Sequence, residues 1–414
     1  MKKKDFKGFP FIEGGVCAAK GFKANGIHCG IKANGDPNKN DLAMILADKP
    51  CTAAAMYTTN KVQGAPIQVT KRHIADGFAQ AVIVNSVNAN TCNADGEEKA
   101  EAMCEAAAKA LGLKPEDIIV ASTGVIGQPL PIEPIVNGVP KLAEGLSETG
   151  NTEAVHAIMT TDTVPKEVAV EFAIGGKTCH LGGMLKGSGM IHPNMATTLT
   201  FLTTDCDIEA GLLKEALREV VFLTLNRVSV DGDTSTNDMV CILANGDAEN
   251  AKITAEGDDY DTFKDALYTV LMNLARMMAR DGEGATKLIE CLCDGAPDDK
   301  TAEIVAKSVI TSSLFKAAIF GEDANWGRIL CAVGYAPADF DIHQVDVTIG
   351  SEKGVILVCE DGAGVEFSEE EAKEILSEEE IRVHVSIGKG DGVAVAWGCD
   401  LTYDYVRING DYRS

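Results

Sequence analysis

The sequence is short of positive charge. It has 37 lysines and arginines against 62 aspartates and glutamates, so its formal net charge is −25 at pH 7. A chain this acidic is not attracted to nucleic acid or to anionic membrane surfaces, which excludes both as expected partners. An anionic substrate would have to meet a local positive charge. A lysine inside a glycine-rich loop is therefore informative in this chain.

Segments that direct a chain into or across a membrane are also lacking. Met1-Lys-Lys-Lys-Asp5 is positively charged, but Phe6-Lys-Gly-Phe-Pro10 is too short and too polar for the apolar part of a secretory signal. No uninterrupted apolar run approaches the length of a transmembrane helix. We therefore expect a cytoplasmic protein.

Cysteine patterns typical of metal centres or disulfide frameworks are absent as well. The 13 cysteines are scattered, and several stand inside apolar runs such as 240–243 and 329–332. This is typical of buried thiols in a reducing compartment. Cys291-Leu-Cys293 has no second pair and no histidine at ligand spacing. We expect no metal site and no requirement for a cofactor.

Helical and strand patterns are mixed along the 414 residues without an internal repeat. The mixture predicts an α/β or α+β fold, and the length suggests two domains. We predict a first domain over 1–280 and a smaller one over 281–414. The predicted strands are 81–85, 117–122, 167–172 and 393–397, and the predicted helices are 97–111, 208–228 after an Asp207 cap, 261–280, and 368–379 with Ser368 as cap.

Three familiar binding motifs are incomplete. Gly176-Lys-Thr178 has Glu171 where a phosphate-binding loop needs its first glycine, and Gly187-Ser-Gly189 continues to His192 where a dinucleotide fingerprint needs glycine. Asp231-Gly-Asp-Thr-Ser235 lacks both the glycine and the bidentate acid of a calcium loop. The three segments therefore do not predict binding of a nucleoside triphosphate, a dinucleotide or calcium.

The most informative segment is a glycine-rich loop that runs into a threonine-rich apolar stretch. It reads Lys186-Gly-Ser-Gly-Met-Ile-His-Pro-Asn-Met-Ala-Thr197 and continues to Thr204. Gly187 and Gly189 allow positive φ and Pro193 restricts its neighbour, so such a loop can hold one peptide bond under strain.

A threonine at the end of this loop could cleave the chain. If the Thr197 hydroxyl attacks the Ala196 carbonyl, an ester forms that water opens, and Thr197 keeps a free α-amine beside its hydroxyl. That amine has a reference pKa of about 7.7 to 8.0, which suits a general base. An ordinary loop-to-strand turn has the same pattern and is more common, because threonine-rich strands are frequent.

Further polar residues could complete a site. Thr123 and Gly124 follow an apolar strand, where N–H groups and a hydroxyl could form an oxyanion hole. Lys186 would suit a substrate carboxylate, Thr160 is a further polar candidate, and Glu283, between two glycines, could meet an ammonium group. Taken singly, each is more typical of a turn or a solvated side chain. His192 lacks a matching serine or cysteine nucleophile, and we interpret it as structural.

Six motifs occur in one order along nearly the whole chain. They are Ser122–Gly127, Thr160–Thr163, Lys186–Thr197, Arg280–Thr286, Gly321–Arg328 and Tyr405–Ser414. In this order they resemble the glutamate N-acetyltransferase family, also called the ornithine acetyltransferase family, of arginine biosynthesis. The resemblance implies a layered α-β-β-α sandwich domain, a smaller C-terminal α/β domain, and self-cleavage between Ala196 and Thr197 into chains 1–196 (α) and 197–414 (β).

The resemblance also implies a role for each matched residue. Thr197 becomes an N-terminal threonine nucleophile that carries the acetyl group, while Thr123 and Gly124 stabilise the oxyanion. The implied acyltransferase reaction moves acetyl from N-acetylornithine to glutamate by a ping-pong route in the cytoplasm, without a cofactor, in an α2β2 heterotetramer. The implied substrate-binding residues are Thr160, Lys186, Thr197, Glu283, Asn409 and Ser414.

Departures from the family pattern are few, and two other functions stay open. Thr198 stands where many members have methionine, Val87 where glycine is common, and Ser414 where threonine is common. None removes a proposed chemical group. An aminopeptidase or amidase with an N-terminal nucleophile would pass its acyl group to water instead. A non-catalytic amino-acid-binding protein would keep its chain intact. The sequence leaves open whether acetyl-CoA is a second donor.

Overall fold

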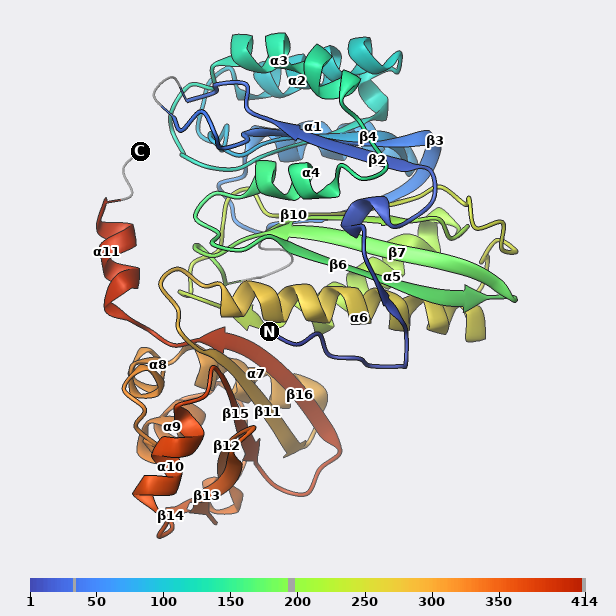
Figure 1. Cartoon of the computed structure of the whole chain (residues 1–414). Coiled ribbons are helices and arrows are strands. Elements are labelled where there is room, and N and C mark those ends of the chain that lie inside the picture. The colour runs from blue at the N-terminus through green and yellow to red at the C-terminus, as the bar shows by residue number, and fades with distance from the viewer. Residues whose placement is uncertain (33–34, 193–197, 412–414) are drawn as a thin grey trace.

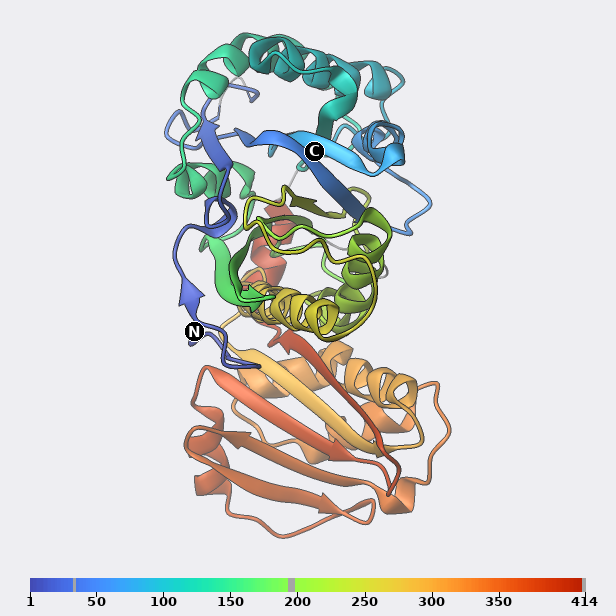
Figure 2. The ribbon, with the colours of Figure 1, turned by 90° about the vertical axis from the view of Figure 1, so that its right-hand side faces the viewer.

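The computed structural model describes residues 1–32, 35–192 and 198–411, and this part of the chain forms two bodies, each built on one sheet (Figure 1, Figure 2). The larger body has a nine-stranded sheet. In order across the sheet its strands are β1 (Phe11–Ile12), β6 (Lys166–Ile174), β7 (Lys177–Lys186), β8 (Leu199–Thr204), β10 (Met239–Ala244), β3 (Leu42–Tyr57), β4 (Phe78–Asn85) and β5 (Ile118–Ser122), with β2 (Phe22–Ile27) also paired to β3.

Strand β3 bends this sheet into two layers. Its first half pairs with β2 and β4, and its second half pairs with β10. The pairing with β4 shifts register between Leu46 and Cys51, around an exposed Asp48-Lys-Pro50 segment. Proline cannot donate a ladder hydrogen bond and is typical of such interruptions. The two layers face each other across a core to which Ile45 and Val84 contribute from one side and Phe201 and Leu243 from the other.

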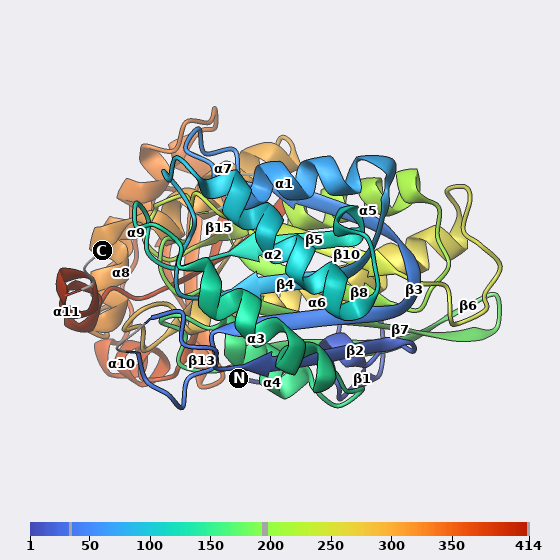
Figure 3. The same cartoon turned by 90° about the horizontal axis from the view of Figure 1, so that it is seen from above.

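Helices cover both outer faces of the folded sheet. On the β2–β5 layer lie α1 (Ala65–His73), α2 (Gly96–Leu111) and α3 (Ile132–Glu144), as Figure 3 shows from above. On the other layer lie α5 (Ala210–Leu223) and α6 (Asp258–Arg280), and α4 (Asn151–Ile158) packs into the core between the layers. The order of layers is helix, sheet, sheet, helix, which confirms the α-β-β-α sandwich.

The smaller body is a mixed sheet with its own core, which contains Ile289, Val347 and Val383. The sheet and its helices confirm the smaller C-terminal α/β unit, whereas the predicted boundary after Arg280 stays a prediction. The strands in order are β14 (Ala363–Gly364), β13 (Gly354–Glu360), β12 (Asp346–Ser351), β15 (Glu380–Ser386), β11 (Leu288–Ala296), β16 (Gly392–Cys399) and β9 (Val228–Ser229). The helices are α7 (Asp299–Thr311), α8 (Ser313–Phe320), α9 (Trp326–Gly334) and α10 (Glu369–Leu376).

The predicted helix 208–228 is wrong at both ends. It begins two residues later, because Glu209 and not Asp207 caps it by accepting from the amides of Gly211 and Leu212. It ends at Leu223, after which Leu225–Arg227 forms a separate 3-10 helix and Val228–Ser229 pairs with Trp397–Gly398 as strand β9. A long-range pairing of two residues has no local pattern that would predict it.

The last helix, α11 (Tyr403–Asp411), lies outside both sheets. It rises from the second body along the side of the first (Figure 1). The Thr402 hydroxyl, at its start, donates to the Gly284 carbonyl at 2.7 Å. This contact brings the end of the chain to the loop that follows α6. No helix within the described ranges combines the length and the apolar composition that a membrane span needs. All 13 cysteines are free thiols.

Candidate active site

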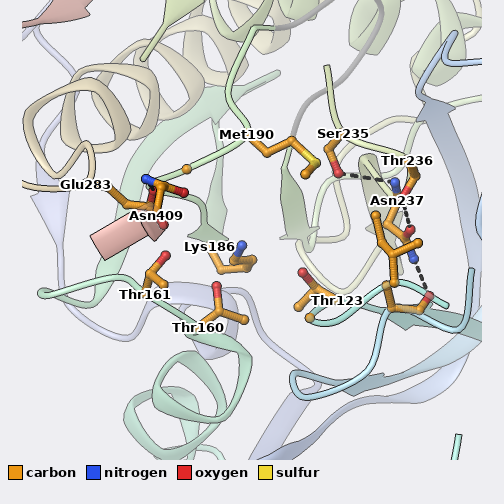
Figure 4. A pocket seen from close by; sticks show the side chains of 14 residues that line it. Thr123, Thr160, Thr161, Lys186, Met190, Ser235, Thr236, Asn237, Glu283 and Asn409 are labelled. Carbon is orange, nitrogen blue, oxygen red and sulfur yellow. Dashed lines mark hydrogen bonds between the residues drawn. The ribbon is translucent and has the colours of Figure 1, made fainter. Parts of the chain in front are cut away.

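One pocket in the larger body gathers residues from both sheet layers and from α11 (Figure 4). It encloses about 620 Å³ of space that is continuous with solvent. Lys186 and Thr160 lie in its middle, Thr123 lies toward one end, and Glu283 and Asn409 lie toward the other. The residues that line it are Ala89, Thr123, Gly124, Ile126, Thr160, Thr161, Lys186, Gly189, Met190, Ser235, Thr236, Asn237, Glu283 and Asn409.

The pocket brings together most of the site residues that the sequence predicts. Those along its lining are Thr123, Gly124, Thr160, Lys186, Glu283 and Asn409, which come from five separate motifs. Ala196, Thr197 and Ser414 lie outside the described residues. Thr198, the neighbour of Thr197 in the chain, lines a smaller cavity to which Thr123 and Lys186 also contribute. The grouping places the residues together, while their individual roles stay predictions.

The turn after β5 supplies the predicted oxyanion group. The Thr123 amide already donates to the Asn85 carbonyl at 3.0 Å, so the group that Thr123 can offer is its hydroxyl. Gly124 has a φ of +126°, and a Cβ there would lie 2.1 Å from the Val87 carbonyl oxygen. Glycine is required at this position for both reasons.

Asn237 holds this turn in place, and sequence reasoning missed it. Its side-chain amide donates to the carbonyls of Ala89 at 2.5 Å and Ser122 at 2.9 Å. Its side-chain oxygen accepts from Thr91 and Thr236, each at 2.6 Å. Four hydrogen bonds saturate the buried amide. The only local signal was the polar run Ser235-Thr-Asn-Asp238, which is equally typical of a loop.

Lys186, at the end of β7, brings positive charge into the pocket. Its side chain is 9% exposed and makes no hydrogen bond within the described part of the chain. Burial opposes ionisation of the nearby Asp162, but Lys166 and Lys186 outweigh it and hold the pKa of Asp162 below its usual range. Asp162 is therefore an anion.

Asp238 is a second buried carboxyl near Lys186, in the opposite state. Burial raises its pKa well above the usual value, against the opposing effects of Ser235 and Lys186. Its Oδ2 atom has no hydrogen-bond partner. Burial without a partner for this oxygen favours the neutral acid. The two buried carboxyls therefore leave one negative charge near Lys186.

Glu283 and Asn409 form the other end of the pocket. The Asn409 amide donates to Glu283 Oε2 at 2.7 Å, and the Glu283 amide donates to the Ser188 carbonyl at 3.0 Å. A Cβ on Gly189 would lie 2.4 Å from the Glu283 carboxylate. The loop that carries Lys186 thus runs directly past the acid. A carboxylate that still has free acceptor positions here can bind an ammonium group.

The expected role of the loop glycines is wrong in one respect. In the described part of the loop the positive φ belongs to Met190, at 57°, and not to Gly187 or Gly189. These two glycines instead leave room for neighbouring side chains, since a Cβ on Gly187 would lie 3.0 Å from Thr198 Cγ2 and a Cβ on Gly189 would lie 2.4 Å from the Glu283 carboxylate. Asp231 holds the loop by accepting from the amides of Met190 at 2.7 Å and Ile191 at 2.9 Å.

His192 contacts Ser229 and Thr234 and does not line the pocket. Its Nδ1 contacts the Ser229 hydroxyl at 3.0 Å, and its carbonyl accepts from the Thr234 hydroxyl at 2.8 Å. Burial lowers its pKa. These contacts agree with the interpretation of His192 as structural.

Among the described residues, one group of possible metal ligands lies away from the pocket. His73, Glu101 and Cys104, on α1 and α2, have ligand atoms within 4.8 Å of one another. Both ring nitrogens of His73 already have partners, namely the Ile118 carbonyl at 2.8 Å and Glu101 at 3.1 Å. These hydrogen bonds give both ring nitrogens partners within the protein, without a metal.

Comparison with known proteins agrees with these motifs. The arginine biosynthesis bifunctional protein ArgJ 1 of Clostridium acetobutylicum is 50% identical over 394 residues, which cover 95% of this chain and 96% of that protein. The ArgJ protein of Bacillus subtilis is 46% identical over 405 residues, 97% of each chain.

A solved structure and a family model also match. The ornithine acetyltransferase of Mycobacterium tuberculosis, solved in complex with ornithine, is 37% identical, with a TM-score of 0.42, over 45% of this chain and 100% of that chain. The model of the ArgJ family matches residues 23–414. The chain therefore belongs to the ArgJ family.

Proposed function

We propose that this protein is a self-processing glutamate N-acetyltransferase of arginine biosynthesis, which moves acetyl from N-acetylornithine to glutamate. The observation that supports this most directly is the pocket itself. A buried cation, a carboxylate and a candidate oxyanion group meet there, although they come from separate motifs. Each matches one part of an N-acetylated diamino acid.

The donor would lie along the pocket. Its α-carboxylate meets Lys186 beside Thr160, and its side-chain ammonium meets Glu283 at the end closed by Asn409. Its acetyl carbonyl then lies toward the Thr123 hydroxyl and the Gly124 N–H. Hydrogen-bond donors that point at the position where negative charge develops stabilise the transition state more than the ground state.

Acetyl transfer would proceed in two balanced steps on Thr197. The Thr197 hydroxyl attacks the acetyl carbonyl, and its α-amine takes the hydroxyl proton and passes it to the leaving nitrogen. The C–N bond breaks, ornithine leaves, and an acetyl ester remains. The α-amine of glutamate then attacks the ester, and the proton returns to the threonine oxygen as N-acetylglutamate leaves.

The same hydroxyl would first cleave the chain between Ala196 and Thr197. Transfer to glutamate and not to water requires that water is kept from the ester. Helix α11 can help to exclude water at one end of the pocket, because Asn409 lines it and contacts Glu283. We further propose an α2β2 assembly in the cytoplasm, which thirteen free cysteines suit.

The reaction is tested by incubating the protein with N-acetylornithine, with and without glutamate. We expect ornithine release that depends on glutamate and matches the N-acetylglutamate formed. Release of free acetate without dependence on glutamate would instead identify an aminopeptidase or amidase. A third assay, with glutamate and acetyl-CoA, decides whether acetyl-CoA is also a donor.

Processing is tested by denaturing electrophoresis and N-terminal sequencing. We expect two fragments, one beginning Thr-Thr-Leu, and a single intact band from Thr197→Ala. An intact wild-type chain with full activity would refute self-cleavage. An intact chain that binds ornithine without any turnover would identify a non-catalytic binding protein.

A further inference from the structure

Three charged side chains are buried together behind the pocket. Lys166, the first residue of β6, donates to Asp162 Oδ1 at 2.7 Å and to Asp281 Oδ2 at 2.5 Å. The side chains of Lys166 and Asp162 are fully buried, and that of Asp281 is 4% exposed. None of the three lines the substrate pocket. They are therefore not in a position to touch a substrate, and any influence on it acts through other residues.

Asp162 holds the residues around Lys186. It accepts from the Thr160 amide at 3.0 Å and from the Gly187 amide at 2.7 Å. Thr160 lines the pocket and Gly187 directly follows Lys186, so one carboxylate fixes two neighbouring segments of the pocket wall. Its ionised state, set by Lys166 and Lys186, makes these hydrogen bonds strong.

Asp281 holds the other end. It accepts from the Thr163 amide at 3.1 Å and from the Thr163 hydroxyl, and it stands two residues before Glu283. Gly282 between them has no room for a side chain, since a Cβ would lie 2.8 Å from Cys399 Sγ. The backbone from Asp281 to Glu283 is therefore closely confined, and Lys166 connects the Lys186 end of the pocket to the Glu283 end.

Buried ion pairs are seldom needed for stability, because desolvation offsets much of their attraction. What they can supply is geometry. We propose that the Asp162–Lys166–Asp281 network fixes the separation of Lys186 and Glu283 and thereby selects donors by side-chain length. The inference rests on the proposed function, in which Lys186 binds the α-carboxylate and Glu283 the side-chain ammonium. Lys166 and Asp281 are then positioning residues that set specificity.

Acetylated diamino acids whose side chains differ from that of the donor by one methylene test the separation of Lys186 and Glu283. They are N-acetyllysine, which is longer, and N-acetyl-2,4-diaminobutyrate, which is shorter. A single methylene is typically worth about 10- to 200-fold in discrimination. The wild type should therefore prefer N-acetylornithine to both by kcat/KM within about that range.

The decisive variant is the double substitution Lys166→Met with Asp281→Asn. It removes one charge of each sign, leaves Asp162 facing Lys186, and replaces a buried pair in a way that proteins often tolerate. We expect a folded protein whose preference for N-acetylornithine falls by about tenfold or more, mainly through KM. The matched control is Arg276→Met with Glu380→Gln, which removes another ion pair, joined at 2.7 Å between the buried Arg276 and the partly exposed Glu380, and neither residue lines the pocket. It should leave the preference unchanged.

Equilibrium binding of ornithine, lysine and 2,4-diaminobutyrate gives a second readout that needs neither processing nor turnover. The two quantities compared are the affinity for ornithine divided by that for lysine, and the affinity for ornithine divided by that for 2,4-diaminobutyrate. If the double variant does not fold, Asp281→Asn alone should lower both ratios by a smaller factor. Ratios within twofold of the wild type in a folded variant would overturn the inference. Wild-type protein that binds ornithine but transfers no acetyl would refute the proposed function. The binding ratios of the variants would still decide whether the network selects ligands by length.

Discussion

The structure limits which groups of Thr123 can bind an oxyanion. Its amide is occupied by Asn85, so its hydroxyl and the Gly124 N–H are the groups left for an oxyanion. Thr123→Val keeps the shape of the side chain and removes that hydroxyl. We expect kcat to fall about 10²- to 10³-fold with little change in KM, since only the transition state would use this bond. Steady-state kinetics on the processed enzyme measures both.

The matched control for Thr123 lies close to the same strand. The Thr70 hydroxyl donates to the Val120 carbonyl in β5 at 2.8 Å, and neither residue lines the pocket. Thr70→Val should lower the thermal midpoint and leave kcat within twofold. Equal losses of kcat in the two variants would mean that Thr123 acts only through stability.

Asp238 predicts how stability depends on pH. Its pKa is raised in the folded state by burial. A carboxyl shifted in this direction supports folding fully below its ordinary pKa of about 3.9, and that support is lost as the pH rises toward the folded pKa. Asp238→Asn carries no titrating group. The thermal midpoint of this variant should therefore rise relative to that of the wild type as the pH increases from the ordinary pKa of about 3.9 to the raised pKa of the folded state.

The size of this effect follows from linkage. Each pH unit over which only the unfolded carboxyl is ionised costs the wild type up to about 1.4 kcal/mol. Thermal melts of both proteins across that range check the trend. A difference between their midpoints that does not change with pH would show that Asp238 ionises normally in the folded protein.

The residues that the sequence could predict are those that carry a motif. Thr123, Lys186 and Glu283 stand in glycine-rich segments with recognisable order. Asn237 and Lys166 could not be predicted, because their importance comes from hydrogen bonds to residues more than 100 positions away or to charges that meet only in the fold. A lysine at the start of a strand has no local mark of burial.

The loop from Lys186 to His192 is the element on which the site depends. Gly189→Ala would place a methyl group 2.4 Å from the Glu283 carboxylate. The end of a side chain can move away, so we expect the fold to persist while Glu283 leaves its place beside Asn409. The KM for N-acetylornithine should rise about tenfold, equivalent to about 1.4 kcal/mol, and more than the KM for glutamate, because only the donor carries a side-chain ammonium.

Gly334→Ala is the matched control, since a Cβ there meets nothing within 4 Å. It should change neither KM. An equal rise in the KM of donor and acceptor in Gly189→Ala would contradict the assignment of Glu283 to the ammonium group. Initial rates with each substrate varied in turn give both constants.

Elements with a strong local pattern were predictable, and those made by pairing at a distance were not. The predicted helix 97–111 is α2 to within one residue, and Ser368 caps α10 as expected by accepting from the Glu371 amide. Strand β9 and the bend of β3 depend on partners in another body or another layer. The spacing of apolar residues along the sequence does not indicate which distant strand a segment will pair with.

The strands on either side of the proposed cleavage position predict how the whole molecule would behave after processing. Strand β8 follows the position and pairs along its length with β7, which precedes it, through Leu199–Thr204 and Leu181–Lys186. Strand β10 follows it and pairs with the second half of β3, which precedes it. The two fragments therefore share one sheet and the core on each of its faces.

Cleavage between residues 196 and 197 should accordingly leave the fragments bound to each other. They should elute together in gel filtration under native conditions and separate only in denaturant, because parting them would expose buried strand edges and both faces of the sheet. The intact Thr197→Ala chain should elute at the same volume as the processed protein, since the fold does not require the peptide bond. Native mass spectrometry of the processed protein then tests the assembly, which we expect to contain two copies of each fragment. Fragments that separate without denaturant would show that β7 and β8 are not paired after processing.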